Sequence, residues 1–156
     1  MLQLLEKQRQ GRRAWMGLLA RAPLEMLEAW HARADPPAHS WLRRPETGLA
    51  MVRARAGGTG EKFNFGEITL TRCAVRLESG ECGVAYVQGR SHRRAELAAL
   101  ADAMLQSARS RDTDQNLVGP LRERLEREAA TRQRKAQATR VEFFTLAREA
   151  AREAEQ

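Results

Sequence analysis

The spacing of apolar residues changes twice along this 156-residue chain, and those two changes limit the folds open to it. Toward both ends apolar residues recur every three or four positions, which indicates amphipathic helices. Between about residues 39 and 89 they alternate with polar residues and are interrupted by glycine-rich turns, which indicates antiparallel strands. The pattern therefore predicts an α+β fold: an antiparallel β-meander of four to five strands packed with helices.

Two helices are expected in residues 1–35, with Gly11 as a possible interruption of the first because glycine is a weak helix former. Pro23 suits the first turn of the second helix. That helix should end before Pro36-Pro37, which cannot continue it. The apolar stripe of the first helix is Leu2, Leu5, Trp15, Leu18 and Leu19, and that of the second is Leu24, Leu27 and Trp30 or His31.

Turn-forming residues divide the central region into short strands. The Pro45–Gly48 sequence places proline early and glycine late, as in a tight turn, and Gly57–Gly60 must be a loop. Gly66 is expected to mark a bulge or kink. The expected strands are Trp41–Arg44, Leu49–Ala56, Lys62–Phe65, Glu67–Leu77 and Cys82–Gln88.

The last two strands form the clearest hairpin in the sequence. With Ser79-Gly80 as a two-residue turn, paired residues have numbers that sum to 159. The pairs on one face are then Leu77 with Cys82, Val75 with Val84, Cys73 with Tyr86, and Thr71 with Gln88. This register keeps Cys73 and Cys82 apart, and a disulfide between them is the disfavoured alternative.

Two more helices are expected after the sheet. Ser91 can cap a helix over residues 92–109 that covers the apolar face of the sheet. Arg109–Gly119 is interpreted as a polar linker, and a long, highly charged C-terminal helix should occupy residues 120–153. The apolar stripe of the covering helix is Leu97, Leu100, Ala101, Met104, Leu105 and Ala108, and the apolar residues of the last helix gather at Val141, Phe143, Phe144 and Leu146. One domain, residues 1–156, accommodates all of these elements.

Positive charge concentrates in residues 43–94, which hold ten Lys/Arg against five Asp/Glu. Arginine predominates there, and its planar guanidinium suits phosphate and carboxylate groups. Backbone N–H groups of a glycine loop or of a helix N-terminus can also face an anion. The anion-site candidates are Gly57, Gly58, Thr59, Gly60, Arg72, Gln88, Gly89 and Arg90. The alternatives are an ordinary glycine-rich turn and arginines that are solvated or paired with Glu67, Glu78 or Glu81.

Catalysis by this chain alone has little support in its sequence. His31, His39 and His92 lack metal-ligand spacing, and both cysteines are expected in the core. Glu46 and Glu61 are a possible carboxylate pair that spacing cannot place together. No zinc-finger, helix-turn-helix or base-stacking motif is present, so nucleic-acid binding is not expected.

The sequence also predicts where the protein is found. It contains no apolar run long enough for a membrane span. The charged residues Glu6, Lys7 and Arg9 argue against a signal peptide. Two cysteines do not make a disulfide framework. A cytoplasmic location is therefore expected.

Five motifs resemble the PhnG subunit family of bacterial carbon–phosphorus lyase. They are Glu46-Thr47-Gly48 with Gly57–Glu61, Thr69–Leu77, Val87–Arg90, Arg13–Met16 near the start, and Thr139–Thr145 near the end. The motifs are long and span nearly the whole chain. Cys73 departs from the alanine expected in that family, which argues against a thiol role, and the tail Ala147–Gln156 looks specific to this sequence.

The resemblance implies an accessory subunit of a multisubunit complex with PhnH-, PhnI- and PhnJ-like proteins. With PhnI-, PhnH- and PhnL-like partners it would take part in displacing adenine from ATP by a phosphonate, giving ribose 1-methylphosphonate 5-triphosphate. PhnI would be the catalytic subunit. ATP (with Mg) and the alkylphosphonate would be substrates of the complex, and this chain alone would bind no cofactor. The alternative from the residues is a stand-alone nucleic-acid or phosphate-ligand binding protein.

Overall fold

The computed structural model describes residues 2–138 of the chain, and the side chains of residues 10–138. Of these, residues 2–122 belong to one compact unit and Glu123–Ala138 to another. The elements are α1 (Leu2–Leu19), α2 (Leu24–Ala34), β1 (His39–Arg55), a 3₁₀ turn (Ala56–Gly58), β2 (Lys62–Leu77), β3 (Cys82–Gln88), α3 (His92–Met104), α4 (Ser110–Thr113), a π-helical segment (Asp114–Val118) and α5 (Gly119–Ala138). The expected α+β class is confirmed.

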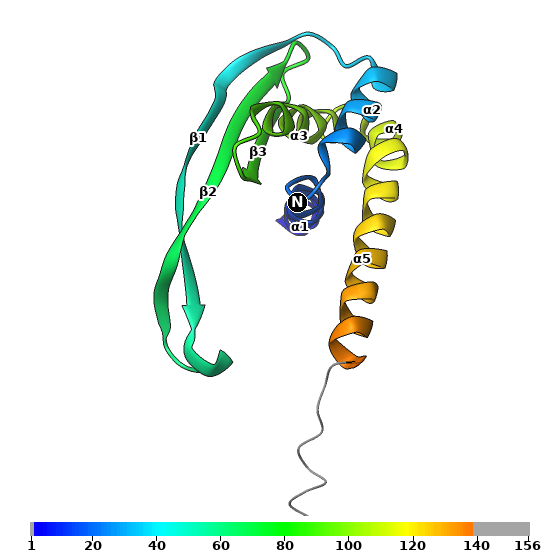
Figure 1. The fold of residues 1–156 in the computed structure, drawn as a ribbon. Coiled ribbons are helices and arrows are strands. Elements are labelled where there is room, and N and C mark those ends of the chain that lie inside the picture. The colour runs from blue at the N-terminus through cyan, green and yellow to red at the C-terminus, as the bar shows by residue number, and fades with distance from the viewer. Residues whose placement is uncertain (1, 139–156) are drawn as a thin grey trace, which may run out of the picture. The chain divides into compact units, whose positions relative to one another are not determined.

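The helix α3 is the centre of the first unit. It packs on β2 and β3, and α1 and α2 pack against it (Figure 1). Every residue from Leu97 to Leu105 is buried, so α3 lacks the polar face of a surface helix. Alanine supplies five of the eight buried apolar residues of α3, and its small side chain lets neighbouring backbones approach closely. The expected cap is present, because the Ser91 hydroxyl accepts a hydrogen bond from the Arg94 N–H at 3.2 Å.

The sheet has three strands in the order β1-β2-β3, so the expected four to five strands are wrong. Pro45 does not turn the chain. It lies within β1, where the pairing with β2 shifts between Arg43 and Glu46. An edge strand with a register irregularity tolerates a residue that lacks an N–H group. The strand therefore continues through the Pro45–Gly48 sequence.

The Lys62–Phe65 and Glu67–Leu77 segments are likewise one strand, β2. The irregularity expected at Gly66 is confirmed: Val52 pairs with Gly66 and Arg53 with Asn64, which leaves Phe65 as the extra residue of a bulge. A bulge bends the strand without ending it, so the glycine here does not separate two strands.

The β2–β3 hairpin forms, but its predicted register is wrong by one residue. Arg76 pairs with Cys82 and Cys73 with Ala85. The loop has three residues and ends at Gly80, whose φ of 105° suits glycine, and the Leu77 N–H donates to the Glu81 carbonyl at 2.9 Å. Because a one-residue slip exchanges the faces of a strand, Gly83, Ala85 and Val87 face the core in place of Cys82, Val84 and Tyr86. Both cysteines are free.

Several helix predictions also change. Helix α1 runs through Gly11 without interruption. Helix α3 ends at Met104, and Ala108 is exposed rather than part of its buried stripe. The expected polar linker is helical, and Thr113, Leu117 and Val118 in it are buried. The π-helical segment, in which Gly119 N–H donates to the Asp114 carbonyl, precedes Pro120. It relieves the clash that proline makes inside a regular helix.

Some predictions fall outside the described residues. They concern the side chains of Leu2 and Leu5, the apolar group Val141, Phe143, Phe144 and Leu146, the motif Thr139–Thr145, the tail Ala147–Gln156, and the last helix beyond Ala138.

Candidate functional site

The glycine loop lies at the tip of the β1–β2 hairpin. Gly57 and Gly58 have φ values of 58° and 82°, which glycine adopts readily. The loop closes on itself: Gly60 N–H donates to the Ala56 carbonyl at 2.8 Å, and Arg55 Nη1 donates to the Gly60 carbonyl at 3.0 Å. Its glycines are therefore explained by the turn, and one of its amides is already used inside the loop.

Arg72 lies on the outer face of the sheet, opposite the face that α3 covers. Its Nε donates to Oε1 of Glu46, and Arg43 Nη1 donates to the same oxygen. These hydrogen bonds, from Arg43 first and Arg72 second, lower the pKa of Glu46 below its ordinary value. The Arg72 side chain remains 46% exposed, so its other N–H groups can reach an external anion.

The junction between β3 and α3 holds the second group of candidates. Gly89 has a φ of 95°, and its N–H donates to the Thr69 carbonyl at 2.9 Å. The buried Thr71 hydroxyl donates to the Gly89 carbonyl at 2.7 Å. Thr47 Oγ1 lies 3.1 Å from Thr71 Oγ1 and 3.1 Å from His92 Nε2, so a chain of polar contacts ties this junction to β1.

Arg90 follows the junction and is exposed, while Gln88 shares the outer face with Arg72. The structure therefore brings Arg72 and Gln88 to one face of the sheet. Arg90 lies two residues after Gln88, just beyond the end of β3. The structure does not bring the glycine loop to these residues. Lys62 and Arg72 are ten positions apart in β2, which at about 3.3 Å per residue is a distance of ~33 Å. The sequence candidates thus divide into a distal tip and an outer sheet face.

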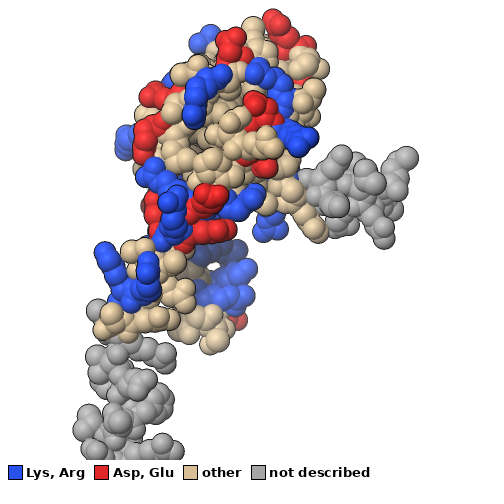
Figure 2. All heavy atoms as spheres, turned by 90° about the vertical axis from the view of Figure 1, so that its right-hand side faces the viewer, with Lys and Arg blue, Asp and Glu red and all other residues tan. Residues whose placement is uncertain are grey.

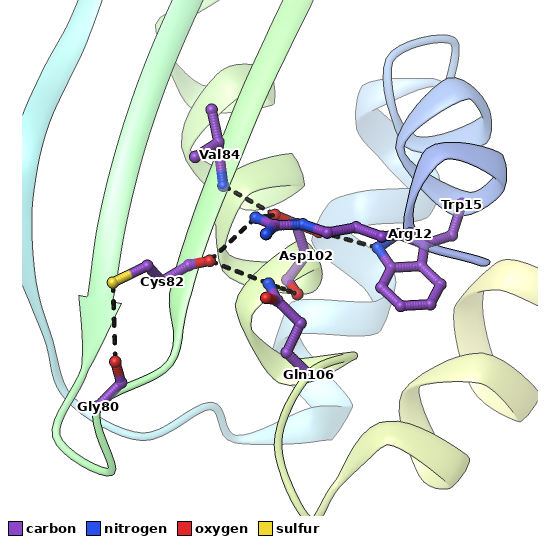
Figure 3. A network of polar contacts seen from close by, with 7 residues as sticks. All are labelled: Arg12, Trp15, Gly80, Cys82, Val84, Asp102 and Gln106. Carbon is purple, nitrogen blue, oxygen red and sulfur yellow. Dashed lines mark hydrogen bonds and ion pairs between the residues drawn. The ribbon is translucent and has the colours of Figure 1, made fainter. Parts of the chain in front are cut away.

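The most connected polar residue was not predicted from the sequence. Asp102, on α3, is completely buried. Its carboxylate accepts hydrogen bonds from Arg12 Nε at 3.2 Å and Nη2 at 2.8 Å, from Trp15 Nε1 at 2.8 Å and from Val84 N–H at 2.9 Å (Figure 3). A buried carboxylate is tolerated when its oxygens are paired in this way. Asp102 therefore joins α1, α3 and β3.

A second acceptor completes this cluster. The Cys82 carbonyl accepts from Arg12 Nη2 at 3.1 Å and from Gln106 Nε2 at 2.9 Å. The signal available in the sequence was an acidic residue inside the alanine-rich stripe of α3, a place where a charge needs a partner. The Arg13–Met16 motif contains Trp15, one of those partners. The motif near the chain start thus has a structural role.

The described residues gather no metal-binding group, and one of the two cysteine thiols is buried. Burial raises the pKa of the Cys73 thiol to about 12, so it stays protonated near neutral pH. No group of three His, Cys, Asp or Glu side chains gathers in a metal-binding arrangement within the described part of the chain.

The two cysteines differ in burial, and this difference gives a first prediction. Brief iodoacetamide treatment of the native protein at pH 8 should alkylate the half-buried Cys82 and leave Cys73 intact, because burial keeps Cys73 protonated and inaccessible. Mass spectrometry should find both alkylated after denaturation. Equal labelling of both in the native protein would contradict the packing described here.

Basic and acidic side chains are mixed on the face drawn in Figure 2, without a continuous basic track. In α5 they alternate closely, and Arg124 pairs with Glu128. A phosphate-tracking surface needs uninterrupted positive charge.

No helix among the described residues has the length and apolar character required to cross a membrane.

Comparison with known proteins identifies relatives over most of the chain. The family model described as phosphonate metabolism protein PhnG matches residues 10–149. A protein of Rhizobium meliloti (strain 1021), named alpha-D-ribose 1-methylphosphonate 5-triphosphate synthase subunit PhnG, is 46% identical over 138 residues, covering 88% of each chain. The matched segment contains α2, the sheet, α3 and the Asp102 cluster.

Proposed function

The chain belongs to the PhnG family of phosphonate metabolism proteins, and from that premise we propose that it is a subunit of alpha-D-ribose 1-methylphosphonate 5-triphosphate synthase. The 46% identity to a protein of that name carries the proposal. The reaction assigned to the complex is displacement of adenine from ATP by a phosphonate, within the breakdown of organic phosphonates. PhnI-, PhnH-, PhnJ- and PhnL-like proteins are the proposed partners.

The chain's part in this reaction is accessory. Burial raises the pKa of the Cys73 thiol to about 12, which keeps it protonated near neutral pH, and the described His, Cys, Asp and Glu side chains form no group of three in a metal-binding arrangement. What it offers is a sheet held rigidly on α3, with exposed arginines on and beside the outer face. Such a surface can contribute guanidinium groups to the polyphosphate of ATP or to the phosphonate at a subunit boundary.

This surface can have one of two roles: it can bind a ligand, or it can bind a partner subunit. Substitution of Arg72 and Arg90 can distinguish them. As ligand groups, they would help hold ATP with its Mg, or the phosphonate, while the partner subunit performs the displacement. As interface groups, they would bind the partner itself. Glu46 orients Arg72 in either case, because it accepts the hydrogen bond from Arg72 Nε.

The prediction is that Arg72→Ala together with Arg90→Ala lowers adenine release by about 100-fold or more in the assembled complex, since each lost contact to an anion costs about 1.5–3 kcal/mol. Both side chains are exposed, so the fold should not change. The measurement is adenine formed from ATP and methylphosphonate, with co-purification of the partner subunits recorded in parallel.

Arg76→Ala is the matched control, because Arg76 lies on the same strand and outer face and is exposed. It should retain both activity and assembly. Loss of co-purification in the Arg72/Arg90 double variant would assign these residues to the interface instead of the ligand. A purified chain that binds RNA or DNA at physiological salt and never assembles with the synthase subunits would overturn the proposal.

A further inference from the structure

The β1–β2 hairpin extends well beyond the rest of the sheet. Strand β3 pairs with β2 only from Leu70 to Arg76, so residues 49–69 form a two-stranded projection, called here the distal ribbon. Figure 1 shows the ribbon running away from α3 to the 3₁₀ turn at its tip. An isolated two-stranded hairpin is marginal in water, and additional packing is what normally stabilises one.

The outer face of the distal ribbon is apolar. Cross-strand partners share a face, so Ala54 lies with Phe63 and Ala50 with Ile68, on the same side as Glu46 and Arg72. Phe63, Phe65 and Ile68 are 46%, 72% and 37% exposed. The Phe63 and Phe65 rings meet edge to face with centroids 6.3 Å apart, which places the bulge residue on this face too.

The opposite face of the ribbon is basic toward its tip. Arg55 pairs across the strands with Lys62, and Arg53 lies two residues before Arg55 on the same side. Glu67 is the acidic residue of that face, opposite Met51. Arg53, Arg55 and Lys62 are all exposed. The ribbon therefore presents aromatic and aliphatic side chains on one side. The other side carries the three cations toward the tip, and the exposed Leu49 and Met51 nearer the three-stranded part of the sheet.

The binding partner that matches both faces of the distal ribbon is the surface of another protein. Exposed apolar patches bounded by charge mark protein-binding sites, and aromatic residues supply much of the binding energy in such sites. A second copy of this chain is disfavoured, because it would add a net charge of +7 to a surface that is already positive. Charge complementarity favours an acidic partner.

We propose that the distal ribbon inserts into an apolar groove with an acidic rim on another subunit of the synthase. This inference rests on the proposed function, and it identifies the part of the chain that makes the assembly. Phe63, Phe65 and Ile68 would be buried in the groove. Arg53, Arg55 and Lys62 would lie against its acidic side chains. The glycine loop at the tip then serves to turn the chain within the interface.

The test is co-expression of the full chain with the PhnI-, PhnH- and PhnJ-like subunits, followed by affinity purification. The triple variant Phe63→Ser, Phe65→Ser, Ile68→Ser should reduce co-purification by about tenfold or more, because it removes the apolar anchors. Leu42→Ser is the matched control. Leu42 is an apolar residue of β1 that is 48% exposed and lies outside the ribbon, so this variant should assemble normally.

A charge variant tests the electrostatic part of the inference, the contact between the basic residues and an acidic rim. Arg53→Glu with Arg55→Glu should weaken assembly and reverse its salt dependence, because repulsion from an acidic rim is screened by salt. The isolated triple variant should keep the wild-type melting temperature within about 2 °C, since its replaced side chains are exposed. A lowered melting temperature together with lost assembly would assign the residues to folding and overturn the inference.

The remaining outcomes separate the two proposals. If the wild-type chain does not assemble with the subunits, the proposed function fails and this inference fails with it. If the wild type assembles and the triple variant assembles equally well, the ribbon inference alone is wrong. Two other results would also overturn it: self-association of the isolated wild type that the triple variant abolishes, or flotation of the wild type with phosphatidylcholine–phosphatidylserine vesicles that the variant abolishes.

Discussion

Asp102→Ala is expected to lower the free energy of unfolding by about 3–5 kcal/mol, the cost of breaking a buried ion pair by removing one partner. Asp102 is fully buried, and its loss leaves the Trp15 and Val84 N–H groups without their acceptor. Urea unfolding of the purified chain, followed by tryptophan fluorescence, measures the change. Trp30 is a suitable reporter because it is buried.

Two comparisons sharpen this prediction. Arg12→Met should cost about as much, about 3–5 kcal/mol, because it leaves the fully buried Asp102 carboxylate without its cation, held only by the hydrogen bonds from Trp15 and Val84. Asp112→Ala is the control. Asp112 is exposed in α4 and accepts from Asn116, so this variant should stay within about 0.5 kcal/mol of wild type. Equal stabilities for Asp102→Ala and Asp112→Ala would contradict the role given to the cluster.

Gly83→Ala is expected to destabilise the protein by about 3 kcal/mol or more, at or above the usual range for an overpacked core. A Cβ at this position would lie 1.9 Å from the Ala99 carbonyl oxygen and 2.6 Å from the Ala103 backbone nitrogen. Both atoms belong to the backbone of α3, so neither can rotate away. The helix would have to move off the sheet, and the same unfolding measurement would detect the loss.

Gly48→Ala is the matched control for Gly83. Gly48 lies in β1 of the same sheet, and a Cβ there would meet nothing within 4 Å. The substitution should therefore be neutral, or slightly stabilising by restricting the unfolded chain. If Gly83→Ala were as well tolerated as Gly48→Ala, the close approach between β3 and α3 would be wrong.

The same close approach explains why the hairpin register could not be obtained from the sequence. A two-residue turn at Ser79-Gly80 and a three-residue loop ending at Gly80 are both compatible with the local residues. The first places Cys82, Val84 and Tyr86 on the core face, which is the more apolar choice. Only the position of α3 excludes it, because α3 lies so close to the strand that the facing residue must be Gly83.

The candidate site was predicted unevenly for a similar reason. The Gly57–Gly60 loop and the Ser91 cap follow from a few adjacent residues, and both are present. The separation of that loop from Arg72 depends on β1 and β2 each being one long strand. The proline and glycine in them are tolerated at an edge strand and a bulge, which are properties of the sheet and not of the local sequence.

By itself, the sequence determined the α+β class, the helix positions up to Met104, the tip loop and, through its long motifs, the family. These depend on periodicity and turn chemistry over short stretches, where each residue acts mainly on its neighbours. The tertiary structure decided the strand count, the β2–β3 register, the burial of Asp102 and the projection of the distal ribbon. Each of these depends on contacts between residues far apart in the chain, such as Arg12 with Asp102, and no local pattern encodes them.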